Sequence, residues 1–312
     1  MSMINLRAHL RLMRFDHWIK NLFMLPGVAI SLAFQLEEIH QRINLKLVGL
    51  VLVSLISLCL ISSANYVINE YLDRGSDSKH PMKKHRVAAN HDFNPWSVLV
   101  HYLVLILTAG MASAPLPSTI KFYLGALLIM GFLYNVKPIR LKDRPYIDVL
   151  SESINNPIRL AIGWHCVTPL TAVPASAFIS YWGVGVFLMS LKRYTEMELI
   201  NNRELLGNYR ESFKKWTPNK LLVFSFIGAL VSAAFSGILL VKYRLEYILM
   251  YPAFIWIFAE YLGISLNLDE ASYAPEKLMR KKRLQGIALV ITLLFLLLSF
   301  MNLPILYQFV YG

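Results

Sequence analysis

The stretch NEYLDRGSDSKHPMKKHR, residues 69–86, follows directly on a long apolar run. Its first nine residues carry four acidic or amide side chains, and a basic segment comes immediately after them. On a helix, Asn69, Asp73 and Asp77 stand at i, i+4 and i+8 and therefore share one face. Like charges at that spacing repel each other, so this face requires a counter-charge.

Oxygen ligands in this number, with no Cys and no cluster of His nearby, suit a hard cation such as Mg²⁺. Mg²⁺ takes one or two carboxylates and completes its shell with waters and substrate phosphates. Lys83 and Arg86 lie just downstream, where they are placed to hold those phosphates. The simpler interpretation is a solvated loop beside a membrane span, and the rest of the chain decides between the two.

Composition indicates an integral membrane protein. The 312 residues are 56% hydrophobic and only 16% charged, with a mean hydropathy of +0.49, whereas soluble domains carry roughly 25% charged residues. We expect one helical domain over residues 1–312, and we assign the net charge of +12 to cytoplasmic loops, not to nucleic-acid binding. Cys59 and Cys166 both fall inside apolar runs, so no disulfide framework is predicted. No cleavable signal peptide is evident.

The apolar segments predict an all-α bundle of nine transmembrane helices. Each segment is near the roughly 20 residues needed to cross the hydrocarbon core. Before them, residues 1–18 form a mixed polar and apolar segment that we expect to lie as an amphipathic helix on the membrane surface. The predicted spans are 20–36, 46–68, 95–114, 118–135, 147–168, 174–191, 219–241, 245–266 and 286–309.

The distribution of Lys and Arg predicts the orientation of these spans. The N-terminus and the loops 69–94, 136–146, 192–220 and 267–285 hold 25 of the 31 basic residues. In a nine-span topology these segments share one face, which we assign to the cytoplasm. The N-terminus is then cytoplasmic and the C-terminus lies outside. We expect an integral protein of the bacterial inner membrane.

A second acidic and basic cluster continues into the span 147–168. Asp148, Glu152, Asn155 and Arg159 recur at helical spacing and form one polar stripe on an otherwise apolar helix. Ionisable groups at membrane depth are costly and usually face a cavity or a functional pathway. The alternative is a structural ion pair that holds two helices together.

A third cluster lies at the cytoplasmic end of the sixth span, where Lys192 and Arg193 precede Glu196. The functional interpretation is a further phosphate clamp. Lys192 and Arg193 are equally placed to be positive-inside anchors, and Lys192 with Glu196 to be a local helix pair worth tenths of a kcal/mol.

The chain resembles the UbiA superfamily of intramembrane prenyltransferases over nearly its whole length. The first motif of that family, N-D-x-x-D-x-x-x-D, is matched from Asn69 to Asp77, with Glu70 in place of the usual Asp. The resemblance implies a bundle with a central cavity open to the cytoplasmic side, and a Mg²⁺-dependent membrane transferase in which Asn69, Glu70, Asp73 and Asp77 bind the metal.

Within the superfamily, the chain is most similar to decaprenyl-phosphate phosphoribosyltransferase-like members. The shared segments are H-P-x-K-x-x-R from His80 to Arg86, W-x-K-N from Trp18 to Asn21, and K-R-x-x-E from Lys192 to Glu196. Asp148 and Arg159 also match. The segment 143–159 departs from those members, and the pair Asp148 and Glu152 also fits the second D-x-x-x-D of the aromatic prenyltransferases.

The resemblance leaves two reactions open. In the first, a membrane-embedded polyprenyl phosphate attacks phosphoribosyl pyrophosphate, a phosphorylated soluble substrate. In the second, an allylic polyprenyl diphosphate is ionised and an aromatic or other acceptor captures the prenyl group. The resemblance implies Asp73, Asp77 and Asp148 as catalytic residues. It implies substrate binding by Lys20, Asn69, Lys83, Arg86, Tyr134, Arg159, Lys192, Arg193 and Glu196.

A transporter or lipid flippase that uses the intramembrane polar stripe is the alternative from a different functional class. The sequence shows no internal inverted repeat, and an odd number of spans does not divide into halves. A non-catalytic relative would be expected to lose Asp73 or Asp77, and this chain keeps both.

Overall fold

A computed structural model describes residues 6–35, 43–81, 83–272, 275–278 and 280–312. Over these ranges the regular structure is entirely helical, as predicted. The elements are α1 (Leu6–Leu12), η1 (Phe15–Met24), α2 (Leu25–Ala33), α4 (Leu45–Asp77), α5 (Val87–Asn90), α6 (Pro95–Ala112), α7 (Ser118–Asn135), η3 (Leu141–Asp143), α8 (Ile147–Ser153), α9 (Asn155–Val167), α10 (Ala175–Ile200), α11 (Arg203–Tyr209), η4 (Glu211–Lys214), α12 (Pro218–Tyr243), η5 (Leu245–Met250), α13 (Tyr251–Leu266), η6 (Glu270–Ser272), α14 (Pro275–Leu278), α15 (Lys282–Phe300) and α16 (Pro304–Tyr311).

Local sequence signals explain where the long helices begin. Asn44 caps α4, since its side-chain oxygen accepts a hydrogen bond of 3.0 Å from the Leu47 amide. Asn94 and Thr217 cap α6 and α12 in the same way, and each is followed by a proline at the first helical position. The 33-residue α4 runs beyond its apolar part, so Asn69, Asp73 and Asp77 lie on its last two turns.

Six helical segments in the described part of the chain are long and apolar enough to cross a membrane. They coincide with six of the nine predicted spans and are α4, α6, α10, α12, η5 with α13, and α15. The other three predicted spans are also helical. They correspond to η1 with α2, whose described part ends at residue 35, to α7, and to α8 with α9. These fall outside the set of six because α2 and α9 have 9 and 13 residues and α7 carries polar groups at both ends.

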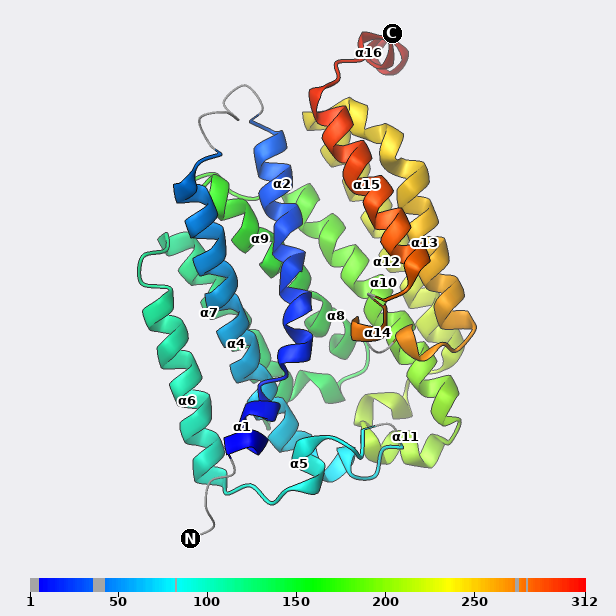
Figure 1. Ribbon diagram of the computed structural model, residues 1–312. Helices are drawn as coiled ribbons and strands as arrows, with labels where there is room; N and C mark the ends of the chain where they lie inside the picture. Colours follow the sequence, from blue (N-terminus) through cyan, green and yellow to red (C-terminus); the bar gives the residue numbers. More distant parts are fainter. Residues whose placement is uncertain (1–5, 36–42, 82, 273–274, 279) are drawn as a thin grey trace.

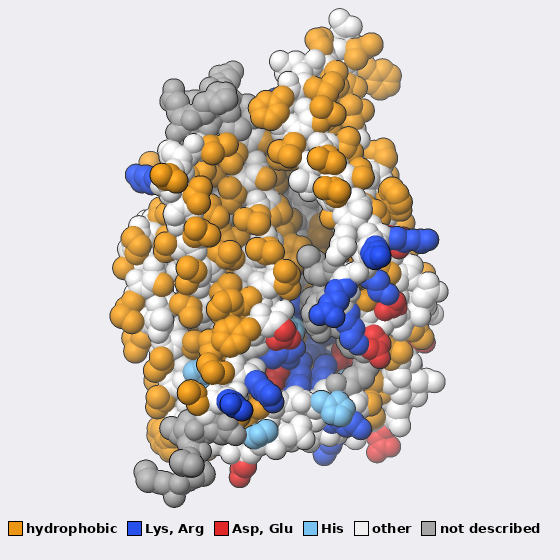
Figure 2. All heavy atoms as spheres, in the orientation of Figure 1, with side chains coloured by type: hydrophobic (Ala, Val, Ile, Leu, Met, Phe, Trp, Pro, Cys, Tyr) orange, Lys and Arg blue, Asp and Glu red, His pale blue; other side chains and the backbone are white. Residues whose placement is uncertain are grey.

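The helices form a bundle in which two groups lie side by side, with α9 of one group in contact with α10 of the other (Figure 1). One group contains α2, α4, α6, α7 and α9, and the other contains α10, α12, α13 and α15. The outer surface is largely apolar (Figure 2), with side chains such as Leu107, Phe122 and Leu293 more than half exposed. A bundle with this surface is suited to a lipid environment, because the apolar side chains that face outward would be unfavourable in water.

Two glycines let α2 and α9 approach each other closely. A Cβ atom on Gly27 would lie 2.0 Å from the carbonyl oxygen of Leu160, and one on Gly163 would lie 1.9 Å from that of Met24. Only glycine fits at such distances, as is common between membrane helices. This packing fixes η1, which precedes α2, against the first turns of α9.

The predicted amphipathic segment 1–18 is only partly described, since residues 1–5 lie outside the described ranges. Its remaining part forms α1 and the start of η1. In α1, Ala8 and Leu12 are buried while Leu6, Arg7 and Arg11 are exposed. Helix α1 lies at the same end of the bundle as α5 and α11, and α16 lies at the opposite end (Figure 1). Cys59 and Cys166 are buried free cysteines, which confirms that they form no disulfide.

Candidate active site

A cavity of about 660 Å³ lies between the helices and collects most of the predicted site residues. Figure 2 shows a hollow between the two groups of helices, with acidic and basic side chains gathered at its lower end. The predicted residues that line the cavity are Lys20, Asn69, Glu70, Asp73, Lys83, Arg86, Tyr134, Glu152, Asn155, Arg159, Lys192, Arg193 and Glu196. Asp77 and Asp148 are predicted catalytic residues that do not line it.

The end of α4 places Asn69 and Asp73 on the cavity wall. Asp73 Oδ1 accepts hydrogen bonds from Lys142 Nζ at 2.6 Å and from Arg140 Nη2 at 3.0 Å. Asn69 Nδ2 donates to Asp73 Oδ2 at 3.3 Å. The counter-charge that the sequence required is therefore supplied by two basic residues of the loop after α7.

The other two acidic groups of the first motif also have basic partners. Glu70 Oε1 accepts a hydrogen bond of 2.9 Å from Arg14, which precedes η1. Arg86 Nη1 donates to Asp77 Oδ2 at 2.8 Å, and Arg86 Nε lies 3.4 Å from Glu70 Oε1. The arginine predicted to hold substrate phosphate thus bridges two of the predicted metal ligands.

The described residues contain no cluster of three or more His, Cys, Asp or Glu side chains arranged to hold a metal ion. The donor chemistry nevertheless fits Mg²⁺, because Asn69, Glu70, Asp73 and Asp77 offer only oxygen ligands from neighbouring turns. Asp77 Oδ1 is buried and has no hydrogen-bond partner in the described part of the chain, and the same holds for Asn65 Oδ1 one turn before Asn69. Both atoms are acceptors that a cation or a hydrated ligand would satisfy.

The H-P-x-K-x-x-R segment ties the end of α4 to α10 and α11. Lys83 Nζ donates to Glu196 Oε1 and to the Tyr209 hydroxyl, and His80 Nε2 lies 3.2 Å from Glu196 Oε1. The His80 and Tyr209 rings meet edge to face with centroids 4.5 Å apart. Burial lowers the pKa of Lys83, although the charge of Glu196 opposes this effect. Lys83 therefore reaches the cavity within a network that joins three elements.

Asp148 belongs to the packing between α8 and the segment after α10. It is fully buried, and its carboxylate accepts bonds from Arg193 Nε at 3.0 Å, Ser212 Oγ at 3.0 Å and Trp216 Nε1 at 3.1 Å. These donors occupy both carboxylate oxygens. Asp148 therefore fits the alternative interpretation of the polar stripe, a structural ion pair between helices, better than it fits a role in contact with substrate.

Glu152, one turn later, does face the cavity but is also paired. Its Oε1 accepts a bond of 2.9 Å from Lys192 Nζ. Its Oε2 accepts bonds of 2.6 Å from Arg193 and 2.8 Å from the Tyr134 hydroxyl. Lys192 and Arg193 therefore hold α8 against α10 and also present basic groups to the cavity.

Arg159 is the deepest basic residue on this stripe. Its Nε donates to Asn21 Oδ1 at 3.1 Å, and its Nη1 donates to the Asn155 carbonyl at 3.2 Å. Among the described residues, no carboxylate lies within ion-pair distance of its guanidinium, although the residue is only 8% exposed. A buried cation without a counter-ion is costly in a membrane bundle, so this position favours an anionic ligand.

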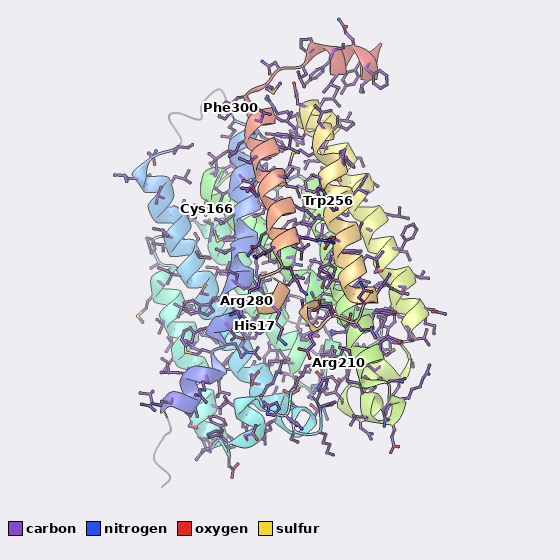
Figure 3. All side chains as sticks on the ribbon, turned by 45° about the vertical axis from the view of Figure 1, so that its right-hand side comes forward. His17, Cys166, Arg210, Trp256, Arg280 and Phe300 are labelled. Atoms are coloured by element: carbon purple, nitrogen blue, oxygen red, sulfur yellow. The ribbon has the colours of Figure 1, made fainter. Side chains whose placement is uncertain are left out.

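Sequence reasoning missed several residues of the site, which come from short helices and loops outside the long apolar helices. They are Arg14, His17, Asn21, Arg140, Lys142, Tyr209 and Arg210. Arg210 lines the cavity and donates to the Tyr134 hydroxyl at 3.3 Å, and Figure 3 shows that it and His17 lie toward the same end of the bundle. The many Lys and Arg residues in the loops 136–146 and 192–220 indicate that some of them belong to the site. The sequence does not show which of these side chains point into the cavity.

Lys142 is the most unusual of the missed residues. It is 2% exposed, and burial lowers its pKa to about 8 even though Asp73 favours the charged form. Arg140, which shares Asp73 with it, has a φ of 30° in the left-handed region. Such a backbone is uncommon for a residue with a Cβ and is found most often where surrounding structure or function demands it.

These features define the class of protein: a helical membrane protein with a polar, predominantly basic cavity between its helices. The chain belongs to the UbiA prenyltransferase family, whose model matches residues 24–281. The resemblance stated from the first motif is thereby confirmed.

Several curated relatives match part of the chain, among them the following two. The first is nodulation protein NoeC of Azorhizobium caulinodans, 24% identical over 59% of this chain and 55% of the relative. The second is decaprenyl-phosphate phosphoribosyltransferase of Mycolicibacterium smegmatis, 24% identical over 67% of this chain and 65% of the relative. Both matches cover less than two thirds of the relative's own length.

The solved structures that match describe a UbiA homologue from Archaeoglobus fulgidus. The structure with GPP and Mg²⁺ has a TM-score of 0.68 and 16% identity, and covers 94% of this chain and 98% of the homologue. The structure with DMAPP and Mg²⁺ has the same TM-score and coverage, with 15% identity. At this identity the likeness establishes the fold of the chain.

Proposed function

We propose that this protein is a Mg²⁺-dependent transferase that moves phosphoribosyl from phosphoribosyl pyrophosphate to a polyprenyl phosphate. The observation that carries the proposal is the charge of the cavity wall. Nine Lys or Arg side chains line the cavity, against five Asp or Glu. A pair of substrates with phosphate groups on both partners complements such a wall better than one diphosphate and a neutral acceptor.

The pairing of Asp148 and Glu152, the second acidic cluster, also favours phosphoribosyl transfer over prenyl transfer. Prenyl transfer with metal at both acidic clusters needs carboxylates that are free to bind it. Asp148 is enclosed by Arg193, Ser212 and Trp216, and Glu152 is held by Lys192 and Arg193. The acids of the first motif are paired as well, but Asp77 Oδ1 is buried without a hydrogen-bond partner among the described residues, so we assign the metal to the motif from Asn69 to Asp77.

In this proposal the sugar phosphates bind at the loop end of the cavity. Lys83 and Arg86 approach from the segment after α4, and Lys192 and Arg193 from α10. Phosphoryl groups are held there mainly by charge and position, as in other reactions of phosphorylated substrates. Tyr134 and Glu196 orient these basic groups, since they bond to Arg193 and Lys83 respectively.

The lipid phosphate binds to Lys20 and Arg159 in this proposal. Arg159 supplies the buried cation that lacks a carboxylate partner among the described residues, and Asn21 holds its guanidinium at 3.1 Å. Lys20 lines the same cavity from η1. An anionic headgroup carried by a membrane lipid would neutralise Arg159 without leaving the bilayer.

Asn69, Glu70, Asp73 and Asp77 would hold Mg²⁺, which when bound neutralises charge on the departing pyrophosphate. Binding of Mg²⁺ requires that Lys142 and Arg140 release an oxygen atom of Asp73. It also requires that Arg86 moves from Asp77 to a substrate phosphate. Asp148 acts in this scheme as a positioning residue that fixes Arg193.

The chemical step is a substitution at the anomeric carbon of the ribose. An oxygen of the lipid phosphate forms a bond to that carbon as the bond to the pyrophosphate oxygen breaks, and the electron pair leaves with pyrophosphate. The basic residues around the cavity bind both anions and hold the attacking and departing oxygens on opposite sides of the carbon. No covalent enzyme intermediate is required.

The membrane arrangement follows the same reasoning. We propose that η1 with α2, α7, and α8 with α9 complete nine crossings together with the six apolar helices. The cavity then opens to the cytoplasm, where a soluble sugar phosphate is available, and the N-terminus is cytoplasmic. The location of α1 and α16 at opposite ends of the bundle supports an odd number of crossings (Figure 1). We propose the bacterial inner membrane as the location.

The test is a Mg²⁺-dependent assay with purified protein, labelled phosphoribosyl pyrophosphate and a short polyprenyl phosphate. Transfer of label into the organic phase supports the proposal, and chelation of Mg²⁺ should abolish it. The control reaction supplies an allylic diphosphate with aromatic acceptors.

Prenyl transfer is the second candidate function, because the solved homologue of the same fold was obtained with GPP or DMAPP and Mg²⁺. Consumption of the allylic diphosphate, without transfer of the sugar label, would assign this chain to that branch. Absence of product in both assays would favour the alternative function of a lipid or solute transporter.

A further inference from the structure

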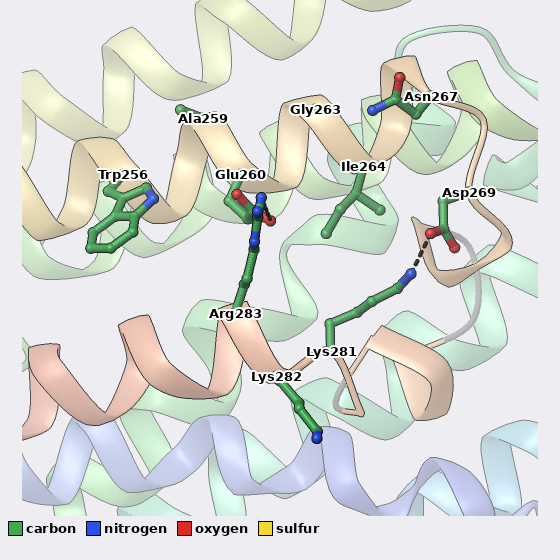
Figure 4. Close-up of a pocket in the computed structure, with 10 residues that line it drawn as sticks. All are labelled: Trp256, Ala259, Glu260, Gly263, Ile264, Asn267, Asp269, Lys281, Lys282 and Arg283. Atoms are coloured by element: carbon green, nitrogen blue, oxygen red, sulfur yellow. Dashed lines mark hydrogen bonds and ion pairs between the residues drawn. The ribbon is translucent and has the colours of Figure 1, made fainter.

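A second pocket, of about 650 Å³, lies outside the candidate active site, in the groove between α13 and α15. Figure 4 shows its lining residues. The α13 wall presents Trp256, Ala259, Glu260, Gly263, Ile264 and Asn267, which recur every three or four residues and so form one face of the helix. Lys281, Lys282 and Arg283 close the other wall.

Along α13, charged side chains line the groove from Asp269 to Glu260, and the end at Trp256 is apolar. At the charged end, Lys281 bonds to Asp269, and Arg283 Nη1 lies 3.8 Å from Glu260 Oε1 (Figure 4). Lys282 extends from α15 (Figure 4). The ion pairs of the described residues in this region join Lys277 to Glu270, Lys281 to Asp269 and Arg283 to Glu260, and include neither Lys282 nor Arg280. The charged end therefore keeps a surplus of positive charge after its carboxylates are paired.

The apolar end faces outward from the bundle. Trp256 is 56% exposed and lies further along α13, away from Arg280 (Figure 3). Nothing lies within 4 Å of where a Cβ atom on Gly263 would stand, so the two helices are separated at this point. The outward faces of α15 carry exposed Leu289 and Leu293, which continue the apolar surface.

We propose that this groove binds an anionic phospholipid. Its phosphate group meets Lys282 and Arg283 in the space beside Gly263, and one acyl chain runs past Ala259 toward Trp256. The charge gradient carries the assignment, because a basic cluster next to an apolar channel between membrane helices complements a lipid with an acidic headgroup. Trp256, which is exposed near the middle of the span 245–266, would contact this acyl chain.

The experiment uses Trp256 as the reporter. The full-length protein is reconstituted in phosphatidylcholine vesicles that contain a minor fraction of brominated phosphatidylglycerol or, in a parallel sample, brominated phosphatidylcholine. Bromine on the acyl chain quenches nearby indoles. We expect stronger quenching by the anionic lipid, and subtraction of the Trp256→Phe signal should show that the excess comes from Trp256 and not from the other five tryptophans.

The charge requirement is tested with matched variants. Lys282→Ala combined with Arg283→Ala should weaken the preference for phosphatidylglycerol by about 25-fold, since each basic side chain near the membrane surface contributes about fivefold. Lys282→Arg combined with Arg283→Lys should retain it. Lys215→Ala, an exposed lysine in the loop before α12, is the remote control and should leave the preference unchanged.

Equal quenching by the two brominated lipids would overturn the proposal, as would a preference that survives the double alanine variant. If Trp256 is shielded from both lipids, a second protein chain occupies the groove and the lipid assignment fails. None of these readouts depends on catalytic activity, so they stand apart from the proposed transferase reaction.

Discussion

Arg193 Nε donates a hydrogen bond of 3.0 Å to Asp148 Oδ2, and the two residues are 45 positions apart in the sequence. Both side chains are almost completely buried. Arg193 also bonds to Glu152 and to the Tyr134 hydroxyl. A single guanidinium therefore joins α7, α8 and α10, and its position depends on Asp148.

Asp148→Ala is expected to lower stability by about 3–5 kcal/mol, because the buried Arg193 would lose one of its two carboxylate partners and Ser212 and Trp216 would lose their buried acceptor. Thermal unfolding of the purified protein in detergent measures the loss. Glu211→Gln, which breaks an exposed ion pair with Lys214, serves as the control and should change little. An Asp148→Ala protein of unchanged stability that is inactive would favour direct catalysis by Asp148.

Asp73→Asn and Asp77→Asn are each expected to reduce Mg²⁺-dependent turnover by about 100- to 1,000-fold, the cost typical of removing one electrostatic contact to a transition state. The fold should be retained, since the asparagine side chain keeps the shape of the carboxylate. Initial rates measured across a Mg²⁺ titration test this. Asp92→Asn, at an exposed loop position, is the matched control, and normal turnover in either site variant would remove that residue from the metal assignment.

Lys142→Met is expected to lower the Mg²⁺ concentration needed for half-maximal rate. The Lys142 ammonium lies 2.6 Å from Asp73 Oδ1, so it competes with a metal ion for that oxygen. The measurement is the midpoint of the Mg²⁺ titration at constant substrate. A midpoint that rises would mean that Lys142 acts with the metal and does not compete with it.

Lys192→Ala is expected to raise the KM for phosphoribosyl pyrophosphate by about 10- to 100-fold, in line with the loss of one hydrogen bond to a charged group. Lys192→Arg should restore much of the affinity. If KM is unchanged and only stability falls, the ion pair of Lys192 with Glu152 is its whole role.

Arg159→Gln is expected to raise the KM for the polyprenyl phosphate by about 10- to 100-fold and to leave that for the sugar substrate unchanged. The effect should be selective because Arg159 is held by Asn21 and is separate from the basic residues at the loop end of the cavity, which we assign to the sugar substrate. Arg159→Lys keeps the charge and should recover part of the lipid affinity. Equal effects on both substrates would contradict separate anion positions.

Much of the architecture could be predicted from the sequence, because a helix that crosses a lipid bilayer must consist mainly of apolar residues. Helices need long apolar runs, and α4, α6, α10, α12, α13 and α15 display them plainly. The spacing of Asn69, Asp73 and Asp77 identified a polar helical face. All six basic residues matched individually to family segments line the cavity, namely Lys20, Lys83, Arg86, Arg159, Lys192 and Arg193. Local periodicity and composition were sufficient for these features.

The partners of each charge could not be read from the sequence. The pairing of Lys83 with Glu196 spans 113 positions, and that of Arg14 with Glu70 spans 56. Such pairs depend on which loops the bundle brings together at one end, and the same loops contain many other Lys and Arg residues that remain outside. Lys142 and Arg210 were missed for this reason.

The sequence by itself determined that this chain is a helical membrane protein with an acidic motif on the last turns of its longest helix, because hydropathy and helical periodicity are local properties. Only the tertiary structure decided which carboxylates remain on the cavity wall. It buries Asp148 against Arg193 and leaves Asp73 at the surface of the cavity, since burial and pairing depend on residues that are distant in sequence and meet only when the helices pack.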